Sequence, residues 1–181
     1  MIRSLLILVA LVAAKVCGAQ RVPNANRGVL VTEDSIGDLG LWAPLGLLRQ
    51  RRPDARDTVR YGESTTYPAV VFPFKGVLVL ASQYADSIDL LQPADAWVVQ
   101  GAARLPGDVP LSSSLSDLQR AFGRAIGFDD LGWTVMFCSH PRFFFEMDVS
   151  DPRPETLSDM AGGTTVASVT ILPVRPAGWH C

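Results

Sequence analysis

The sequence predicts an α+β protein in which short helices pack on an antiparallel sheet as two tandem helix-then-hairpin modules. Two observations support this fold class. Residues 39–53 and 109–123 align at a constant offset of 70 without gaps, and Leu45 meets Leu115 in this alignment. Each window is followed by short runs rich in β-branched and aromatic residues, which are typical of strands. Because both helices are short, we expect packing against the sheet to hold them.

Composition narrows the classes of function. The chain has 181 residues, of which 48% are hydrophobic and 19% are charged, and its net charge is −2. The near-neutral charge argues against a nucleic-acid-binding protein, in which basic residues gather in patches. No apolar run reaches the roughly 20 residues that a membrane span needs. We therefore expect a soluble globular protein that binds no nucleic acid and has no membrane span after signal cleavage.

The N-terminus resembles an export signal. Arg3 supplies a positive charge, and residues 5–14 form an apolar core of the length found in signal peptides. Small residues allow cleavage after Ala14 or after Ala19, and we favour Ala19 because an extended, polar-flanked segment follows it. We expect residues 1–19 to be a signal peptide and the protein to be periplasmic or extracellular.

The first module is predicted over residues 36–101, after an irregular lead-in over 20–35. Pro44 lies where a first helical turn tolerates a missing N–H, and Pro53 ends the helix. Strands are expected over residues 58–63, 67–74, 77–83 and 96–101, with a tight turn at Lys75-Gly76.

The second module is predicted over residues 102–181. Ser114 can cap its helix, and Gly123 can close it in the left-handed conformation. The buried face of this helix consists of Leu115, Leu118 and Phe122. Strands are expected over residues 133–139, 143–149 and 166–174, with a turn at His140–Arg142 and an exposed loop over 151–165.

Cysteine usage follows from the predicted export. Removal of the signal peptide takes away Cys17 and leaves Cys138 and Cys181, an even pair in an oxidising compartment. We expect these two residues to form a disulfide. A Cys₂His₂ metal site that adds His140 and His180 is the alternative, but adjacent His180 and Cys181 do not fit the spacing of structural zinc ligands.

Catalytic patterns are sparse. A hydrolase could combine Ser139 or one of Ser112–Ser114 with His140 and with Asp129 or Asp130, but no Gly-x-Ser-x-Gly elbow occurs. A thiol enzyme could pair Cys138 with His140, which would share one face of a strand. Such a site also needs a third, orienting group, and a disulfide would remove the thiol. We therefore predict no catalytic residue, no metal site and no cofactor.

Aromatic residues are the remaining candidates for a binding site. Three consecutive phenylalanines at 143–145 must place at least one ring on the face opposite the other two. An exposed Phe144 or Trp133 beside Arg142 would have the composition of a protein-binding hot spot. We take Trp133, Arg142 and Phe144 as the candidate contact residues for another protein.

The element order resembles small exported proteins of known type. A Ser-x-x-Asp-Leu-x-x-x-Phe-Gly helix at residues 114–123 is followed by a hairpin and a late strand. This order is similar to that of the β-lactamase-inhibitor-protein family, which carries two such modules in tandem, and of the small lipoprotein of the outer-membrane assembly machinery. The resemblance covers roughly residues 36–174 and implies a non-catalytic, protein-binding scaffold. It transfers no binding residue to this chain.

Overall fold

The computed structural model describes residues 28–61, 65–129, 133–149 and 154–174, and the side chains of 126–129 are not included in this description. The predicted signal peptide at residues 1–19, His180 and Cys181 therefore lie outside the described residues. No helix within these ranges is both long enough and apolar enough to cross a membrane.

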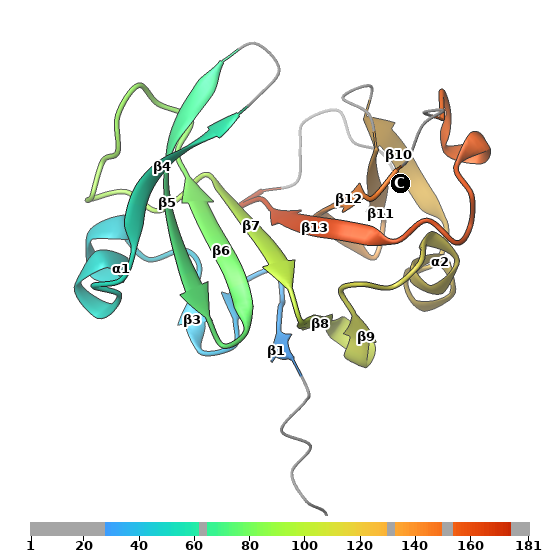
Figure 1. Cartoon of the computed structure of the whole chain (residues 1–181), viewed down its shortest axis with the longest axis horizontal. Coiled ribbons are helices and arrows are strands. Elements are labelled where there is room, and N and C mark those ends of the chain that lie inside the picture. The colour runs from blue at the N-terminus through green and yellow to red at the C-terminus, as the bar shows by residue number, and fades with distance from the viewer. Residues whose placement is uncertain (1–27, 62–64, 130–132, 150–153, 175–181) are drawn as a thin grey trace, which may run out of the picture.

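Eight strands form one antiparallel sheet, and two short helices accompany it (Figure 1). The first half of the chain contributes β4 (Arg56–Tyr61), β5 (Thr66–Phe74), β6 (Val77–Ser82) and β7 (Ala96–Gly101). The second half contributes β10 (Ala125–Asp129), β11 (Thr134–Phe137), β12 (His140–Met147) and β13 (Val166–Ile171). Helix α1 (Leu45–Arg51) precedes the first four strands and α2 (Leu115–Phe122) precedes the second four. The predicted α+β class, with helices packed on an antiparallel sheet, is confirmed.

Strand order joins the two halves at the middle of the sheet. The order is β10-β11-β12-β13-β7-β6-β5-β4, so each half runs from an outer edge to the centre. The last strands of the halves pair there, with Val99 opposite Val169 and Trp97 opposite Ile171. Helices α1 and α2 begin 70 residues apart, and so do β7 and β13. The offset found between the helix windows therefore also relates the two central strands.

The N-terminus of each helix is held by the loop that precedes the last strand of its half. In the first half, the N–H groups of Leu45 and Gly46 donate to the carbonyls of Gln92 and Leu90, at 2.9 and 2.8 Å. In the second half, the N–H groups of Leu115 and Ser116 donate to the carbonyls of Thr164 and Gly162, at 2.8 and 2.9 Å. These bonds satisfy donors that a helix cannot satisfy itself, and they tie each helix to the sheet.

Helix α2 also has the caps that the sequence predicts. The Asp117 N–H donates to the Ser114 Oγ at 3.2 Å, and Gly123 ends the helix with a φ of 87°. Helix α1 has no side-chain cap, and Pro44 occupies its N-cap position. Gly46 lies in the first turn of α1 because a Cβ there would lie only 2.9 Å from the Leu90 carbonyl oxygen.

One apolar cluster serves both halves of the chain. Its buried strand residues include Phe72, Val79, Trp97, Val99, Phe143, Phe145, Val169 and Ile171. The same cluster includes Leu45 and Leu48 from α1 and Leu115, Leu118 and Phe122 from α2. Because paired residues in the registers share a face, all of these side chains lie on one side of the sheet. The two predicted modules thus share one core.

Two small sheets lie beside the large one. Strands β1 (Val29–Leu30), β8 (Ala103–Leu105) and β9 (Val109–Pro110) form one, and β2 (Ser35–Ile36) and β3 (Leu39–Gly40) form the other. Short 3₁₀ helices occur at Pro106–Asp108 and Leu157–Asp159. The sequence predicts an irregular lead-in over residues 20–35, but Val29 and Leu30 of this segment pair in parallel with Ala103 and Arg104.

The turn between β11 and β12 differs from the prediction. The sequence predicts a turn at His140–Arg142, whereas the turn lies at Cys138-Ser139 and β12 already begins at His140. The pairing register of β11 and β12 shifts between Val135 and Phe137, which brings Phe137 opposite His140. This shift leaves only two residues for the turn.

The Ser114 cap provides a first test of the fold. We expect Ser114→Ala to lower the free energy of unfolding by about 1 kcal/mol, because the Asp117 N–H loses its acceptor. Denaturant unfolding measures this change, and Gln119→Ala on the exposed side of the same helix is the matched control. Equal effects of the two substitutions would show that the cap contributes nothing specific.

Candidate functional site

The Cys138-Ser139-His140 segment forms the turn between β11 and β12 and packs against the end of α2. The Ser139 Oγ donates to the Phe122 carbonyl at 2.8 Å and lies 3.0 Å from the His140 Nδ1. Because the hydroxyl proton is directed at a carbonyl, the imidazole Nδ1–H donates to Oγ. A nucleophile and its base need the opposite arrangement, in which the imidazole accepts the hydroxyl proton.

His140 is an aromatic packing residue. Its ring lies 4.5 Å from the Phe122 ring and is stacked on Phe143 at 5.6 Å. Burial among these rings lowers the pKa of His140, and the charge of Glu33 opposes this shift. Burial at this position therefore favours the neutral form of the imidazole.

Within the described residues, no set of metal-ligating side chains forms around His140. Ser114 is used as the helix cap, and the described part of the chain contains no group of three His, Cys, Asp or Glu residues that could hold a metal ion. The side chain of Asp129, all of Asp130, His180 and Cys181 are outside the described residues. Cys138 is half-buried in the turn, and its pairing with Cys181 stays a prediction.

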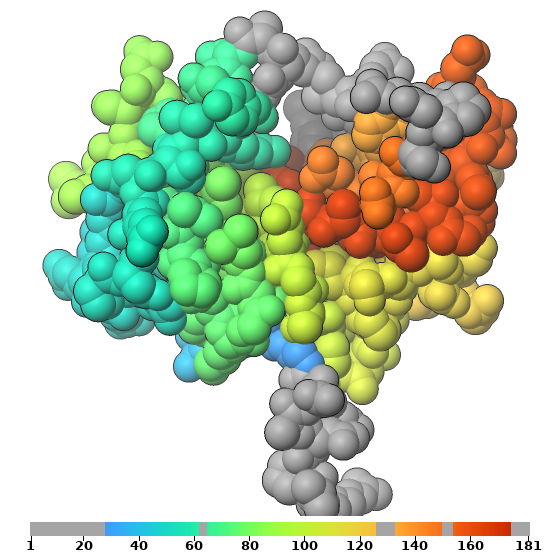
Figure 2. Space-filling view, in the orientation of Figure 1, coloured from blue at the N-terminus to red at the C-terminus, as the bar shows by residue number. Residues whose placement is uncertain are grey.

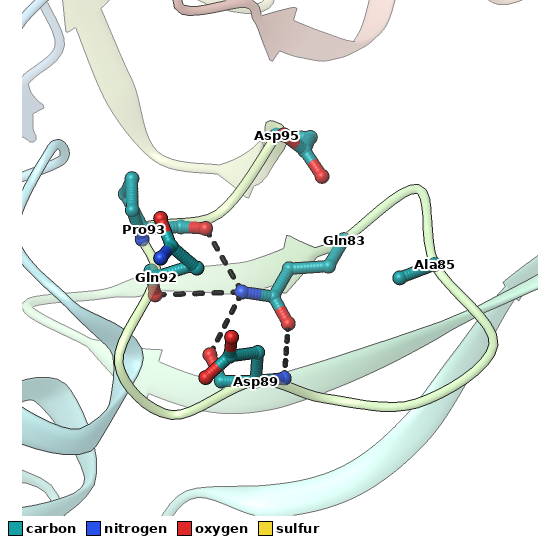
Figure 3. A pocket seen from close by; sticks show the side chains of 6 residues that line it. All are labelled: Gln83, Ala85, Asp89, Gln92, Pro93 and Asp95. Atoms are coloured by element: carbon teal, nitrogen blue, oxygen red, sulfur yellow. Dashed lines mark hydrogen bonds between the residues drawn. The ribbon is translucent and has the colours of Figure 1, made fainter.

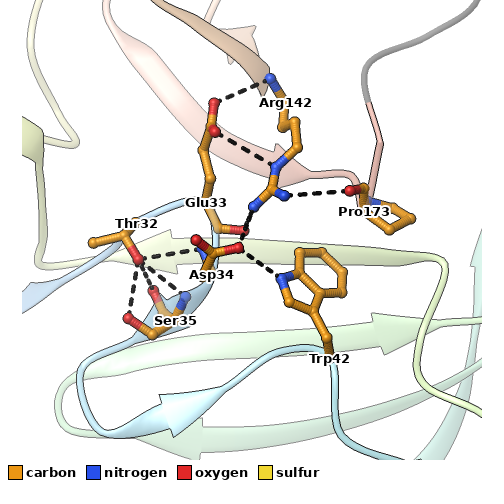
Figure 4. A network of polar contacts seen from close by, with 7 residues as sticks. All are labelled: Thr32, Glu33, Asp34, Ser35, Trp42, Arg142 and Pro173. Atoms are coloured by element: carbon orange, nitrogen blue, oxygen red, sulfur yellow. Dashed lines mark hydrogen bonds and ion pairs between the residues drawn. The ribbon is translucent and has the colours of Figure 1, made fainter.

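Arg142 connects the N-terminal segment to the second half of the sheet (Figure 4). Its guanidinium donates to the Asp34 carboxylate at 2.6 Å, to the main-chain carbonyl of Glu33 and to the Pro173 carbonyl at 3.3 Å. It also lies 5.2 Å above the Trp42 ring, and the Trp42 Nε1–H donates to Asp34 at 3.0 Å. The hydrogen bonds from Arg142 and Trp42 lower the pKa of Asp34.

This network gives Arg142 a structural role. Its side chain is only 20% exposed, and its Nη1 and Nη2 atoms donate to groups of the same chain. The sequence places Arg142 among the candidate contact residues, but its partners Glu33 and Asp34 lie more than 100 residues earlier. No local pattern around Arg142 indicates them.

The other two candidate contact residues are separated by the sheet. Trp133 packs against the apolar core at the start of β11, where its φ is 115° and its carbonyl accepts from the Met147 N–H at 2.8 Å. Phe144 is half-buried and points away from the core, on the face opposite Phe143 and Phe145. The structure therefore confirms that the three phenylalanines divide between the two faces.

Gln83 organises the long loop between β6 and β7 (Figure 3). Its buried amide nitrogen donates to the carbonyls of Asp89 and Pro93 at 3.0 and 2.9 Å, and its oxygen accepts from the Asp89 N–H at 2.7 Å. A shallow cavity of about 260 Å³ lies beside it. Because the Gln83 amide is already satisfied by the loop, it fixes the loop and is not directed at a ligand.

The face of the large sheet opposite the core is the most extended candidate surface. Both helices and the core lie on the other side, and Figure 2 shows β5, β6, β7 and β13 with no helix in front of them. We call this surface the open face. Its apolar side chains include Val71, Leu78, Leu80, Val98 and Phe144. Leu78 is 47% exposed.

The sequence carries a signal for the open face. Residues 77–81 of β6 are apolar without interruption, whereas a strand with one wet face alternates apolar and polar residues. Such a run places apolar side chains on both faces. The sequence therefore predicts that both faces of β6 are apolar. It does not indicate which of the two faces packs against the core.

Comparison with known proteins shows the fold alone. No protein-family model matches the chain, and no curated protein matches its sequence. Among solved structures, the chain is similar to the uncharacterized protein YfeY from Escherichia coli, with a TM-score of 0.53 and 16% sequence identity. The match covers 80% of this chain and 99% of that chain.

Arg142 can be tested as a structural link. We expect Arg142→Met to lower the free energy of unfolding by about 2 kcal/mol, because the main-chain carbonyls of Glu33 and Pro173 lose their donor. Arg120→Met is the matched control, since Arg120 is 76% exposed and forms a surface ion pair with Asp117. A loss no larger than that of the control would contradict the structural role.

His140 predicts a specific dependence of stability on pH. Its folded pKa is lowered, so the unfolded chain binds the proton first as the pH falls. The stability contribution is complete above the ordinary histidine pKa of about 6.5 and decreases as the pH falls below it. We expect His140→Phe to flatten this decrease in unfolding free energies measured between pH 8 and about 5. Parallel curves for the two proteins would exclude His140 as the titrating group.

Proposed function

We propose that this chain is an exported, non-catalytic binding protein of the cell envelope or the secreted fraction, and that it contacts a protein partner through the open face. The observation that carries the proposal is one-sided burial. The helices and the core occupy one side of an eight-stranded sheet, while apolar side chains such as Leu78 remain exposed on the other. Extended apolar surface of this kind marks interaction sites.

The β4 end of the open face has the composition of a binding hot spot. Tyr67 and Tyr84 lie edge to face with ring centroids 4.9 Å apart, and the Arg60 Nη1 donates to the Tyr84 hydroxyl at 3.2 Å. Tyrosine and arginine are enriched at the energetic centres of protein interfaces. Their mutual contacts order these side chains before binding, which lowers the entropy that an interface must remove.

Two further observations support a non-catalytic role. The Ser139 hydroxyl and the His140 ring are engaged in a turn and in aromatic packing.

The proposed export is supported by the signal pattern at residues 1–19, which is also the reason to expect the Cys138–Cys181 disulfide.

Site-specific photo-crosslinking tests the proposed surface in cells of the source organism. A photoreactive amino acid at Leu78 should yield discrete adducts of higher mass, because this side chain lies in the expected contact. The matched control places it at Gln119, which is exposed on α2 on the opposite side. Adducts of equal yield from both positions, or none from Leu78 in folded protein, would contradict the proposal.

Intact-mass analysis of the same exported protein examines the export prediction. We expect a chain that begins at Gln20 and gains alkyl groups at cysteine only after reduction. A chain that retains residues 1–19, or two thiols that react before reduction, would contradict that part of the proposal.

A further inference from the structure

We propose that the edge strand β4 binds an extended segment of the partner as an added strand, and that this segment alternates acidic and apolar side chains. The inference rests on the proposed function and names the class of partner. It is carried by the regularity of β4, by the direction of its backbone groups and by the different chemistry of its two faces.

Strand β4 is a regular edge. It is the last strand of the sheet, and no other strand of the described residues pairs with its outer side. Six consecutive pairs join it to β5, from Arg56 opposite Val71 to Tyr61 opposite Thr66, without a register shift. The other edge strand, β10, is interrupted by a shift between Ala125 and Gly127. Bulges of this kind protect sheet edges from further pairing, and β4 has none.

The pairing pattern shows which groups of β4 face outward. The Gln83 N–H donates to the Pro68 carbonyl at 3.1 Å, so residue 68 of β5 directs its backbone groups at β6. Its neighbours at positions 67 and 69 therefore direct theirs at β4, where they pair with Arg60 and Thr58. By the same alternation, Asp57, Val59 and Tyr61 present their N–H and C=O groups at the free edge.

The face of β4 on the core side presents Val59 and Tyr61 beside Asp57. Val59 is 45% exposed and Tyr61 is 80% exposed, although both belong to a strand. The large apolar side chains exposed in the described residues are nine in number, and five of them lie on β4, on α1 or on the adjoining loop: Leu47, Val59, Tyr61, Leu90 and Leu91. This face takes apolar side chains of an added strand.

An open cleft of about 380 Å³ adjoins this face. It is lined by Arg49, Asp57, Thr58, Pro68, Ile88 and Leu90. The one carboxylate in the lining, that of Asp57, forms an ion pair with Arg49. Its charge is therefore compensated within the chain and does not oppose an apolar segment beside it.

The other face of β4 is basic. Arg56 and Arg60 alternate with Thr58 on this face, beside the open face of the sheet. Neither arginine forms an ion pair with any residue that the structure describes, and Arg60 donates to the neutral Tyr84 hydroxyl. Acidic side chains at alternate positions of an added strand would lie opposite these cations, and opposite charges across strands are favourable. Because one face of β4 offers apolar contacts and the other offers cations, the added strand should alternate apolar and acidic side chains.

Peptide binding to the mature chain tests this inference. The probe is a fluorescein-labelled peptide of alternating Glu and Val, as long as β4, and fluorescence anisotropy measures its dissociation constant. One control peptide has the same composition in two blocks, and another has Lys in place of Glu. We expect the alternating acidic peptide to bind at least about tenfold more tightly than either control.

Variants of β4 distinguish an edge that binds an added strand from an edge whose arginines only prevent further pairing. The double substitution Arg56→Glu with Arg60→Glu should invert the preference between the Glu and Lys peptides. Val59→Pro removes an outward N–H without removing a bond to β5, so it should abolish binding while the protein remains folded. Should that variant fail to fold, a probe peptide N-methylated at alternate residues replaces it and should bind at least about tenfold more weakly.

The outcomes distinguish this inference from the proposed function. Equal binding of all three peptides, or an unchanged preference after charge reversal, would overturn the edge site and leave the arginines as edge protection. Adducts from Leu78 in that case would leave the open face as the contact surface. Peptide binding without such adducts would support the edge site and overturn the open face.

Discussion

One-sided burial is the constraint on which the other features depend. In the part of the chain that the structure describes, two short α-helices and two small sheets accompany the eight-stranded sheet. They cover a single face, and the apolar residues of both halves meet there in one cluster. Helices this short have little stability of their own, so their first N–H groups are tied to loop carbonyls in each half. The same arrangement places no helix or second sheet of the described residues on the opposite face.

The sequence predicted local structure where the determinants are local. Ser114 and Gly123 mark the ends of α2 by their side-chain and backbone chemistry, and β7 has the predicted bounds at residues 96–101. Strand β10 was missed because five residues containing Gly127 give a weak strand signal. The turn at residues 140–142 was misplaced because Pro141 is typical of turns, whereas a register shift moves the turn earlier.

The candidate site was less predictable because its partners are distant in the chain. Arg142 resembles an interface residue, but the groups that accept its hydrogen bonds at positions 33 and 34 lie in a segment predicted to be irregular. The halves also share a further sequence signal. Gly37-Asp38 and Gly107-Asp108 lie at the same offset of 70 and form the turns of the two small hairpins, where both glycines have positive φ. Extending the helix alignment upstream would have located both hairpins.

The central pairing of β7 with β13 has a consequence for the order of assembly. A chain that emerges N-terminus first completes α1 and β4 to β7 well before β13 appears. Until then, β7 is itself an edge strand whose outer backbone groups are unpaired. Trp97 and Val99 also lack their neighbours on β13. The first half is thus an intermediate with an aggregation-prone sheet edge until β13 pairs with β7. A chain released before residue 171 would retain that exposed edge, so truncation near the C-terminus favours aggregation over a smaller stable domain.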